Sequence, residues 1–549
     1  MKSKKAIWQK NKILTGEQIE FARLILQEVQ QGESVFKSIR RHPLPDGGYM
    51  AKHLLVSAYH TLVQNGKLVP DGGLLQQIRM KPMRTLSGVT TVTVLTKPHP
   101  CPGTCIFCPS DEQLPKSYLR DEPGAARAFQ NQFDPYLQVS SRLESYRAIG
   151  HPSNKVELLI LGGCWTAYPE EYREWFVRRC LDAMNGSQSP DLAAAQQLNQ
   201  NAPHRNVGLV VETRPDEVNV RALVHLRRLG VTKVQMGAQS FNDEILTLNQ
   251  RGHTSRETLQ ATALLRAAGF KIVLHWMPNL LGATPELDRE DFLKMWQGGY
   301  CPDEIKIYPT QLLENTALYE YWQKGQYQPY STEQLIQLIA DVKTSIPPYC
   351  RVNRVVRDIP SDHIVAGSRR SSLRQDALAE LARRGQRCQC IRCREIRNES
   401  FEPAKLTLQD VEYEAAFASE HFLQFTTAND RLAGYLRLSL PSQQADKTWH
   451  KERQQLLDLA PELQNAGIIR EVHVYGQSVE VGHEQNGAAQ HIGLGSALLL
   501  KAEEFCQQAG LQKLVVISAI GTREYYQARG YVLGNLYMTK QLTGEKARS

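Results

Sequence analysis

The sequence contains no long hydrophobic run, and none of its stretches approaches the roughly 18 apolar residues that a membrane-spanning helix needs. The first twenty residues carry five lysines but no continuous apolar segment, so we expect no secretory signal peptide and a cytoplasmic protein. Internal repeats and low-complexity segments are also missing. The 549 residues, 42% hydrophobic and 8% aromatic, are typical of an ordinary globular protein with about three domains.

A fourth cysteine is missing from the most cysteine-dense stretch, KPHPCPGTCIFCPSD, where Cys101, Cys105 and Cys108 occur. Iron–sulfur clusters and structural zinc sites are usually held by four protein ligands. Three thiolates would leave one iron of a 4Fe-4S cluster open. An open iron can bind an amine and a carboxylate, and S-adenosylmethionine (SAM) offers both. The spacing therefore predicts a 4Fe-4S cluster that binds SAM, with a zinc knuckle or three unrelated buried thiols as the alternative.

A second group of cysteines, Cys388, Cys390 and Cys393 in RCQCIRC, also lacks a fourth cysteine beside it. Zinc prefers tetrahedral sets of four ligands, so the fourth must come from elsewhere, and His363 is one candidate. We interpret this group as a structural zinc site in an Arg-rich linker, residues 351–397. Free thiols are the alternative, because the cysteines of a large intracellular chain are expected to be reduced.

Charge of one sign is unevenly distributed. The chain carries a net charge of +8, and residues 1–84 account for all of it, with 14 Lys and Arg against six Asp and Glu. Residues 351–397 form a second basic segment, with 12 Arg against five acidic residues. Two basic segments in an otherwise neutral chain are typical of proteins that contact phosphate backbones. We therefore expect RNA binding, with solvated helix surfaces as the alternative.

The spacing of apolar residues follows two different patterns along the first 350 residues. Residues 1–78 repeat apolar residues at helical spacing, as in GEQIEFARLILQEVQQ, which predicts a small basic helical domain. In residues 79–350, short apolar runs such as KVELLILGG, NVGLVVET and FKIVLHWMP alternate with helical stretches. Repeated strand–helix units predict an α/β domain with a parallel sheet that is covered on both faces.

Polar residues and glycines follow several of the predicted strands. In a parallel barrel the carboxyl ends of the strands meet at one rim, where ligands bind. We therefore expect a site at that rim, formed by Gly162, Gly163, Glu212, Thr213, Arg214, Gln239, Ser240, Lys306 and Tyr308.

Residues 398–549 show a third pattern of predicted strands and helices. Predicted strands come in succession, AAFASEHFLQFT, RLAGYLRLSL and IIREVHVYG, before a helix from about Gly495 and the strand KLVVISA. This order predicts a mixed α+β domain. The glycines of QHIGLGS open the helix and predict a pyrophosphate cradle, because they let backbone amides approach closely at an electropositive helix N-terminus. A helix cap without a ligand is the alternative.

The Cys-x3-Cys-x2-Cys spacing ahead of the first strong strand resembles the signature of the radical SAM superfamily. The resemblance implies a partial (βα)6 barrel. It also implies that Gly162 and Gly163 contact the methionine amine of SAM and that Glu212 binds the ribose hydroxyls. Gln239 and Ser240 would supply further polar contacts. A salt bridge inside the barrel is the alternative for Glu212.

The last domain resembles the GCN5-related acetyltransferase fold. The resemblance implies that acetyl-CoA binds through its pyrophosphate to Gln490, His491, Ile492, Gly493, Leu494, Gly495 and Ser496. Tyr525 and Tyr526, in TREYYQARGY, lie where a phenol could donate a proton to the leaving thiolate. Aromatic packing in the core is the alternative for both tyrosines.

With both halves in this order, the chain resembles the family of Elongator catalytic subunits, which modify the wobble uridine of tRNA. The resemblance rests on SGVTTVTVLTKPHPCPGTCIFCP, EPGAARAFQNQFDPY, VETRPD, NQRGHT, EIKIYPT, RVNRVVRDIPSDHI, REVHVYG, GLGSALL and REYYQARGY. The compact cysteine clusters indicate a prokaryotic member, which would work without accessory Elongator subunits. A homodimer and the identity of the electron donor stay open.

The family implies a reaction with two cofactors. A SAM-derived radical would take hydrogen from the methyl group of acetyl-CoA, and the carbon radical would add to carbon 5 of the uracil. Loss of the thioester to water would leave a carboxymethyl group. The two basic segments would hold the anticodon arm of tRNA, and Lys306 and Tyr308 would order the acetyl group or the uridine. A protein lysine acetyltransferase and a non-catalytic RNA-binding scaffold are the alternatives.

Overall fold

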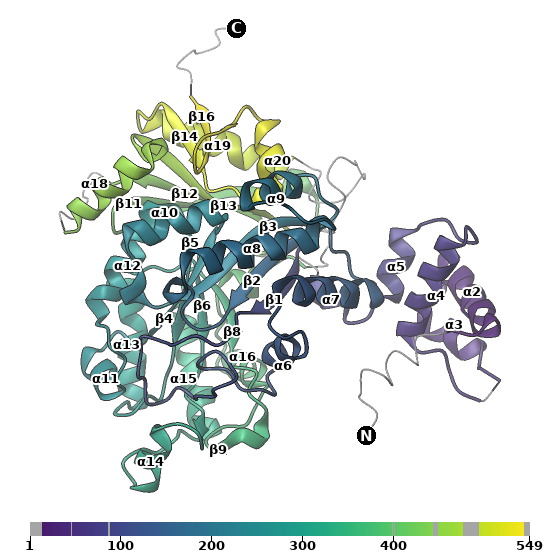
Figure 1. The fold of residues 1–549 in the computed structure, drawn as a ribbon, viewed down its shortest axis with the longest axis horizontal. Helices are drawn as coiled ribbons and strands as arrows, with labels where there is room; N and C mark the ends of the chain where they lie inside the picture. Colours follow the sequence, from purple (N-terminus) through teal and green to yellow (C-terminus); the bar gives the residue numbers. More distant parts are fainter. Residues whose placement is uncertain are drawn as a thin grey trace.

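A computed structural model of the protein contains two large β-sheets and a separate group of helices (Figure 1). Within the described ranges, none of the helices has the length and hydropathy of a membrane span. The structure describes residues 14–45, 47–85, 88–397, 399, 401–442, 448–475 and 493–542.

Four helices near the N-terminus stand apart from the body of the molecule (Figure 1). Their apolar residues, among them Ile25 and Leu55, form a small core of their own. The bundle meets the body at α7 (Pro135–Ala148), where His60 Nε2 lies 3.1 Å from the carbonyl oxygen of Arg147. The four helices are α2 (Gly16–Gln30), α3 (Val35–Arg41), α4 (Lys52–Gln64) and α5 (Gly72–Ile78).

Seven parallel strands form the first sheet, in the order β1-β2-β3-β4-β5-β6-β8. They are short runs rich in Val, Ile and Leu, and helices cover the sheet, as expected for parallel strands. The strands are β1 (Thr90–Leu95), β2 (Lys155–Leu161), β3 (Arg205–Thr213), β4 (Lys233–Gln239), β5 (Lys271–Trp276), β6 (Glu304–Ile307) and β8 (Arg351–Val355). The helices of this part, besides α7, are α6 (Pro123–Gln130), α8 (Glu170–Asn185), α9 (Leu192–Asn199), α10 (Val220–Leu229), α11 (Asp243–Leu248), α12 (Ser255–Ala267), α13 (Pro285–Gln297), α14 (Leu318–Gln323), α15 (Thr332–Thr344), α16 (Leu373–Arg383) and α17 (Ile391–Arg394).

The seventh strand of this sheet lies where the sequence analysis expected a linker. Residues 351–355 form β8 and pair with β6, so the sheet has one strand more than a (βα)6 barrel. The run RVNRV hides the strand because only Val352 and Val355 are buried, as an edge strand with one apolar face allows. Two short strands, β7 (Leu312–Leu313) and β9 (Ile364–Ala366), form a separate antiparallel pair.

The second sheet has the order β10-β11-β12-β13-β14-β16-β15, and its neighbours are antiparallel except β13 and β14. The stretch AAFASEHFLQFT is not one strand: it spans the end of β10, a turn and all of β11. Phe417 takes a φ of 69° in that turn. The elements are β10 (Thr407–Ala415), β11 (Ala418–Thr426), β12 (Leu432–Pro441), α18 (His450–Leu459), β13 (Ala466–Val474), α19 (Leu494–Gln508), β14 (Lys513–Val516), α20 (Arg523–Gln527), β15 (Val532–Leu533) and β16 (Met538–Gln541).

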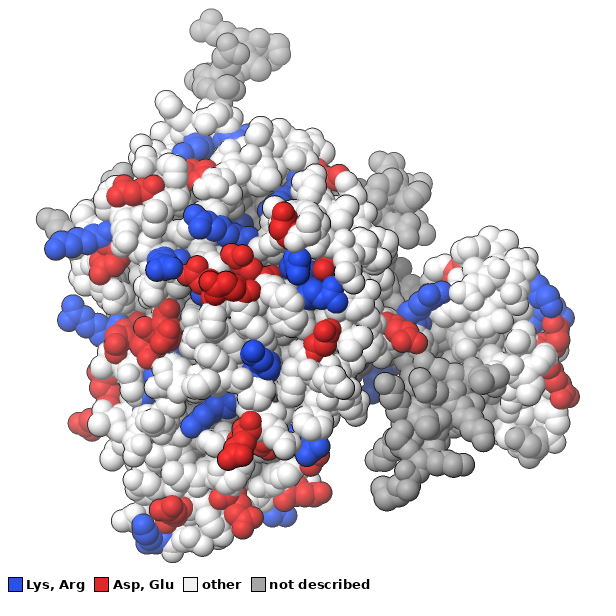
Figure 2. Space-filling model, viewed as in Figure 1, with Lys and Arg blue, Asp and Glu red and all other residues white. Residues whose placement is uncertain are grey.

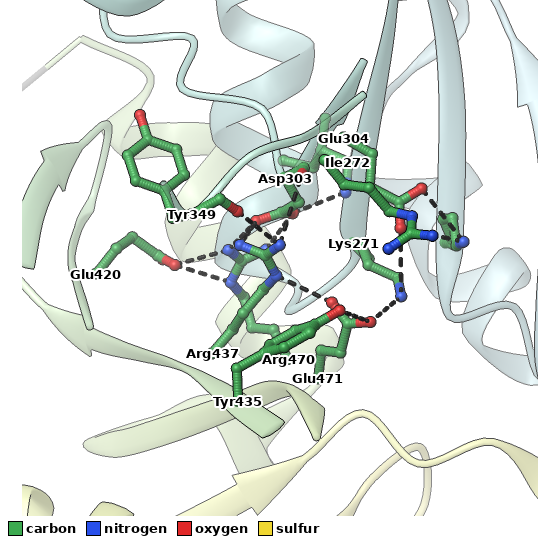
Figure 3. A network of polar contacts seen from close by, with 12 residues as sticks. Lys271, Ile272, Asp303, Glu304, Tyr349, Glu420, Tyr435, Arg437, Arg470 and Glu471 are labelled. Atoms are coloured by element: carbon green, nitrogen blue, oxygen red, sulfur yellow. Dashed lines mark hydrogen bonds and ion pairs between the residues drawn. The ribbon is translucent and has the colours of Figure 1, made fainter. Parts of the chain in front are cut away.

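The two sheets meet across a buried network of charges (Figure 3). Arg470 of β13 holds both oxygens of Asp303, which directly precedes β6, at 2.6 and 2.7 Å. The same guanidinium donates to Glu420 of β11 at 2.7 Å. Arg437 of β12 adds an ion pair with Asp303 at 3.3 Å and one with Glu471 at 2.9 Å. None of these five side chains is more than 9% exposed.

The carboxyl group of Asp303 is charged in the folded protein despite its burial. Burial alone would raise its pKa, but the guanidinium groups of Arg470 and Arg437 hold the pKa well below its usual range. A depressed carboxyl pKa adds stability at pH values above the pKa of the unfolded chain. That contribution is therefore complete at neutral pH and is lost as the pH falls through the acid range.

We expect Arg470→Met to lower the free energy of unfolding by about 3–5 kcal/mol, because the substitution leaves Asp303 and Glu420 buried with an incomplete set of partners. Urea denaturation at pH 7 measures the change. Arg383→Met is the matched control, because Arg383 is 72% exposed in its pair with Glu380 and should cost less than about 1 kcal/mol. Equal losses in the two variants would show that the network does not stabilise the interface.

Candidate active site

The loop after β1 carries the first three cysteines into a cavity of about 460 Å³. Cys101, Cys105 and Cys108 all line this barrel cavity. Arg251 donates a hydrogen bond to Cys105 Sγ at 3.3 Å, and Arg214 lies 4.0 Å from the same sulfur. Cysteines bind metal as thiolates, and these two guanidinium groups lie where they can balance the negative charge of a thiolate-held cluster. The three cysteines therefore fit a 4Fe-4S cluster with three protein ligands.

The glycine pair after β2 allows a close approach of backbones. Gly162 has a φ of 150°, and a Cβ atom at this position would lie 1.9 Å from Thr96 Oγ1. Gly163 has a φ of 87° and lines the barrel cavity. Neither position accommodates another residue without strain. The contact of this pair with the methionine end of SAM stays a prediction.

Glu212, near the end of β3, faces the same cavity. The Tyr118 hydroxyl donates a hydrogen bond to Glu212 Oε2 at 2.7 Å. Burial and the charge of Glu212 raise the pKa of Tyr118 well above its usual range, so the phenol keeps its proton. Lys306 Nζ lies 3.7 Å from Glu212 Oε1. The barrel salt bridge considered as the alternative thus exists, but its length exceeds that of a hydrogen bond.

The neighbouring strands add Gln235, His275, Lys306 and Tyr308 to the cavity wall. His275 Nε2 lies 3.0 Å from Gln235 Oε1. Burial, followed by the charges of Lys306 and Arg357, lowers the pKa of His275 well below its usual range. The ring is therefore neutral. The ammonium group of Lys306 lies 5.7 Å from the ring centre of Tyr308, so the predicted pair does share one wall.

Gln239 and Ser240, at the end of β4, lie in different surroundings. Gln239 takes a φ of 70° and lines the barrel cavity. Ser240 is buried, and its hydroxyl oxygen accepts a hydrogen bond from the backbone of Asn242 at 3.1 Å. Ser240 is not part of the cavity lining, so the structure brings only Gln239 to the site.

Sequence reasoning missed several residues of this cavity. It did place Thr213 and Arg214 at the rim, and both line the cavity. Tyr118 lies 94 positions from Glu212, and nothing around it in the sequence points to the site. The missed lining residues are Tyr118, Gln235, Arg251, His275, Arg354 and Arg357.

A larger cavity of about 860 Å³ lies between the two sheets. This intersheet cavity is lined by residues of the barrel and by residues of the second sheet, among them His473 and Tyr526. Gln235, Lys306 and Arg354 line both cavities. Thr93, Leu159, Arg357 and Asp358 also line both, so the barrel cavity and the intersheet cavity adjoin across seven residues.

The glycine turn of the second domain lies at the start of α19. Gly493 takes a φ of 79° before the helix, and Ser496 accepts a hydrogen bond from Arg529 at 3.2 Å. A Cβ atom at Gly495 would lie 2.8 Å from the Tyr525 hydroxyl oxygen, so this tyrosine contacts the turn. The predicted ligands Gln490, His491 and Ile492 lie outside the described residues.

The two candidate tyrosines differ in their surroundings. Tyr526 is 7% exposed, packs within the core of the second sheet and lines the intersheet cavity. Burial raises its pKa above the usual range. Its ring also meets Tyr525 and Tyr531 edge to face. The packing role considered as the alternative is therefore present together with access to the cavity.

The second cysteine group is compact. The sulfur atoms of Cys388, Cys390 and Cys393 lie within 4.8 Å of one another. Hydrogen bonds from the other two thiols lower the pKa of Cys390 well below its usual range, and the charge of Lys343 adds to this effect. Lys343 is buried, and its ammonium group has no hydrogen-bond partner among the described residues. Three close thiols beside a buried cation fit a zinc site.

His363 does not supply the fourth ligand of that group. Its Nε2 atom lies 3.2 Å from Asp121 Oδ2 at the surface, and it is not among the residues gathered around the three sulfur atoms. His363 directly precedes β9, whereas the cysteine group packs beside Cys350, just ahead of β8.

The fold and the cavity define a class of protein. Residues 99–295 match the family model described as "Radical SAM superfamily", and residues 302–383 match "Radical_SAM C-terminal domain". The chain is therefore a radical SAM protein, and its second sheet is consistent with an acetyltransferase-like domain. The predicted fold class is confirmed.

Several relatives resemble the chain over most of its length. A protein of Dehalococcoides mccartyi (strain CBDB1) named tRNA uridine(34) acetyltransferase is 40% identical over 84% of this chain and 99% of its own. Elongator complex protein 3 of Danio rerio is 36% identical over 85% of this chain and 87% of its own. The solved structure of Elp3 from Methanocaldococcus infernus, with residues 1–46 deleted, matches with a TM-score of 0.71 and 35% identity. That match covers 83% of this chain and 99% of the solved one.

These similarities place the chain in a particular family. It belongs to the family of tRNA uridine(34) acetyltransferases and Elongator complex protein 3. Identity is higher with the bacterial relative than with the animal one, as expected for a prokaryotic type.

We expect Gly162→Ala to weaken SAM binding more than tenfold, because the new methyl group would meet Thr96 Oγ1 and displace the loop beside the cysteines. Isothermal titration of the anaerobic protein with SAM measures the affinity. Gly186→Ala is the matched control, because Gly186 also has a positive φ, 74°, but open space around it. It should cost about 1 kcal/mol of stability and leave SAM binding unchanged. Equal SAM affinities in the two variants would contradict a role for the glycine pair.

Proposed function

We propose that this protein modifies tRNA, and that it installs a carboxymethyl group on carbon 5 of the wobble uridine with SAM and acetyl-CoA as co-substrates. The observation that carries the proposal is the adjoining pair of cavities. One contains Cys101, Cys105 and Cys108, and the other extends to Tyr526. A reaction that takes hydrogen from an acetyl methyl group and joins the carbon to uracil needs such a shared space. The names of the relatives support uridine 34 as the substrate.

The residues of the barrel cavity suit this reaction. A bound 4Fe-4S cluster supplies the electron that cleaves SAM to a 5′-deoxyadenosyl radical. The three cysteines would hold the cluster, and Glu212 would offer its two oxygens to the ribose hydroxyls. Lys306 and Gln235 line both cavities, and the neutral His275 of the barrel cavity contacts Gln235; all three could orient the acetyl group or the uracil. Tyr526 keeps its proton and could donate a hydrogen bond to the leaving thiolate.

The same proposal assigns a role to each domain of the chain. Residues 1–78, ahead of the barrel, and residues 351–397, which include its last strand β8, would hold the anticodon arm of tRNA. Residues 398–549 would bind acetyl-CoA. On the face shown in Figure 2, basic and acidic side chains are interspersed over the body, so this face carries no field of one sign. RNA contacts are therefore expected at particular arginines rather than across this face.

A zinc ion at Cys388, Cys390 and Cys393 would have a structural role. The backbone N–H of Ile391 donates to the carbonyl of Cys350, just ahead of β8, at 2.9 Å. The cysteine group therefore holds the arginine-rich segment against the edge of the barrel sheet.

The product can be tested directly. Anaerobic incubation with SAM, acetyl-CoA, a reductant and tRNA should yield carboxymethyl uridine, detected by mass spectrometry of nucleosides. Cys105→Ala should abolish the product, because the cluster loses one of three ligands, while acetyl-CoA binding persists. Cys180→Ala is the control, because Cys180 is a buried core thiol that lines neither cavity; it should retain the product.

Other outcomes would favour the alternatives. Absence of the product with an intact cluster would contradict the proposal. Lysine acetylation that survives Cys105→Ala would support a protein acetyltransferase. A reconstituted protein without iron–sulfur absorbance would support a non-catalytic RNA-binding scaffold.

We expect about one zinc ion per chain by elemental analysis, and its loss in Cys390→Ser. Metal bound at 100 to 1,000 times its dissociation constant adds about 3–4 kcal/mol to the free energy of unfolding, so the variant should lose that amount. Cys180→Ser places a similar hydroxyl in the core and should keep the zinc. Equal zinc contents in the two variants would exclude this site.

A further inference from the structure

The arginine-rich segment contains two arginines that differ from most of their neighbours. Eight of its twelve arginines have a carboxylate oxygen within 4.0 Å: Arg351, Arg354, Arg357, Arg370, Arg383, Arg384, Arg387 and Arg394. Arg374 and Arg392 have no such partner among the described residues, and both line the intersheet cavity. Their charge is therefore available to a ligand.

Both guanidinium groups are held in place by the backbone of β8. Arg374 Nη2 donates to the carbonyl of Val352 at 3.0 Å, and Arg392 Nη1 donates to the carbonyl of Asn353 at 3.1 Å. These are the only hydrogen bonds of either group within the part of the chain described. A guanidinium has five N–H donors, so most of them remain free.

The two groups repel each other. Burial, followed by the nearby charge of Arg392, lowers the pKa of Arg374 to about 10, which leaves it charged at neutral pH. The charge of Glu395 acts on Arg392, but Glu395 is itself paired with Arg351. Two adjacent, partly buried cations with no carboxylate oxygen within 4.0 Å form an arrangement that an anion would stabilise, in addition to the favourable charge of the nearby Cys390 thiol group.

We propose that Arg374 and Arg392 form a binding site for one phosphodiester group of single-stranded RNA, at the wall of the intersheet cavity. The inference rests on the proposed function, since it assigns a contact to the same substrate. Ser371 and Gln375 line the cavity beside them and can add neutral donors.

The position of the pair favours RNA over the phosphates of acetyl-CoA. The carbonyls that hold the arginines belong to Val352 and Asn353, and the next residue, Arg354, pairs in register with Lys306 of β6. Lys306 is one of the side chains shared with the barrel cavity. A phosphate at the pair would place its nucleotide beside the passage to the cysteines, whereas the glycine turn at α19 offers a separate cradle for pyrophosphate.

The test is a binding titration of the full chain with a fluorescent anticodon stem–loop RNA at several salt concentrations. Arg374→Gln and Arg392→Gln should each weaken binding about tenfold, the size expected for a charged hydrogen bond. The slope of log affinity against log salt should become less steep by about 0.7 in the double variant, the value for one phosphate of a single strand. The Lys variants retain the charge and should recover part of the affinity.

Arg383→Gln is the matched control. Arg383 lies on α16, the helix that also carries Arg374, and it forms an exposed pair with Glu380. The substitution removes the same formal charge. It should change the affinity less than twofold. Urea midpoints of the variants, measured in parallel, should match that of the wild type. Acetyl-CoA titration should give the same affinity in all of them.

The other possible results overturn either this inference alone or this inference together with the proposed function. Unchanged RNA binding in the double variant, with a wild type that binds the stem–loop, overturns this inference and leaves the proposed function standing. A loss of acetyl-CoA affinity instead of RNA affinity assigns the pair to the CoA phosphates and also overturns it. The inference is also overturned if the Arg374 and Arg392 variants lose no more RNA affinity than Arg383→Gln. It is overturned as well if a lower urea midpoint accounts for their loss of RNA affinity. A wild type that binds the stem–loop no better than unrelated RNA overturns both proposals.

Discussion

The buried pair of Arg470 and Asp303 sets the geometry of the whole molecule. A carboxylate without solvent needs its cationic partner, so β13 cannot move away from the start of β6 without a large electrostatic cost. The hydrophobic core is also continuous between the two sheets. Interfaces between domains of one chain are commonly polar and permit motion, whereas this one combines apolar burial with charges that tolerate little displacement.

That constraint explains why two cavities adjoin. The candidate site of each domain follows an ordinary rule: the barrel cavity lies at the carboxyl ends of the strands, and the glycine turn of the second domain lies at a helix N-terminus. Neither rule says where the two sites lie relative to each other. The charge network at β6 and β13 does so, and Lys306 of β6 then faces both cavities. The positions of the two sites are thus a property of the interface rather than of either domain.

Sequence patterns predicted the parts that depend on local rules. The structure places the three cysteines, the glycines after β2 and the strand-end Glu212 in one cavity or beside it, as these patterns predicted. Contacts across the chain could not be predicted in this way: Tyr118 reaches Glu212 over 94 positions, and β8 looks like a linker because its exposed face carries arginine and asparagine. The hairpin of β10 and β11 was missed for a related reason, since Ala416 and Phe417 are unusual turn residues. His363 had no pattern behind it, and the structure pairs it with Asp121 instead.

The separation of Asp303 and Arg470 along the chain also has a consequence for biosynthesis. The two residues are 167 positions apart. At about 5–20 residues per second, a ribosome needs roughly 10–30 s to make Arg470 after Asp303. During that interval Asp303 of the nascent barrel lacks both of its arginine partners, Arg437 and Arg470, and remains hydrated. The barrel of this protein therefore reaches its final packing only after the C-terminal sheet has been synthesised, and translation speed sets how long that carboxylate stays exposed to the cell.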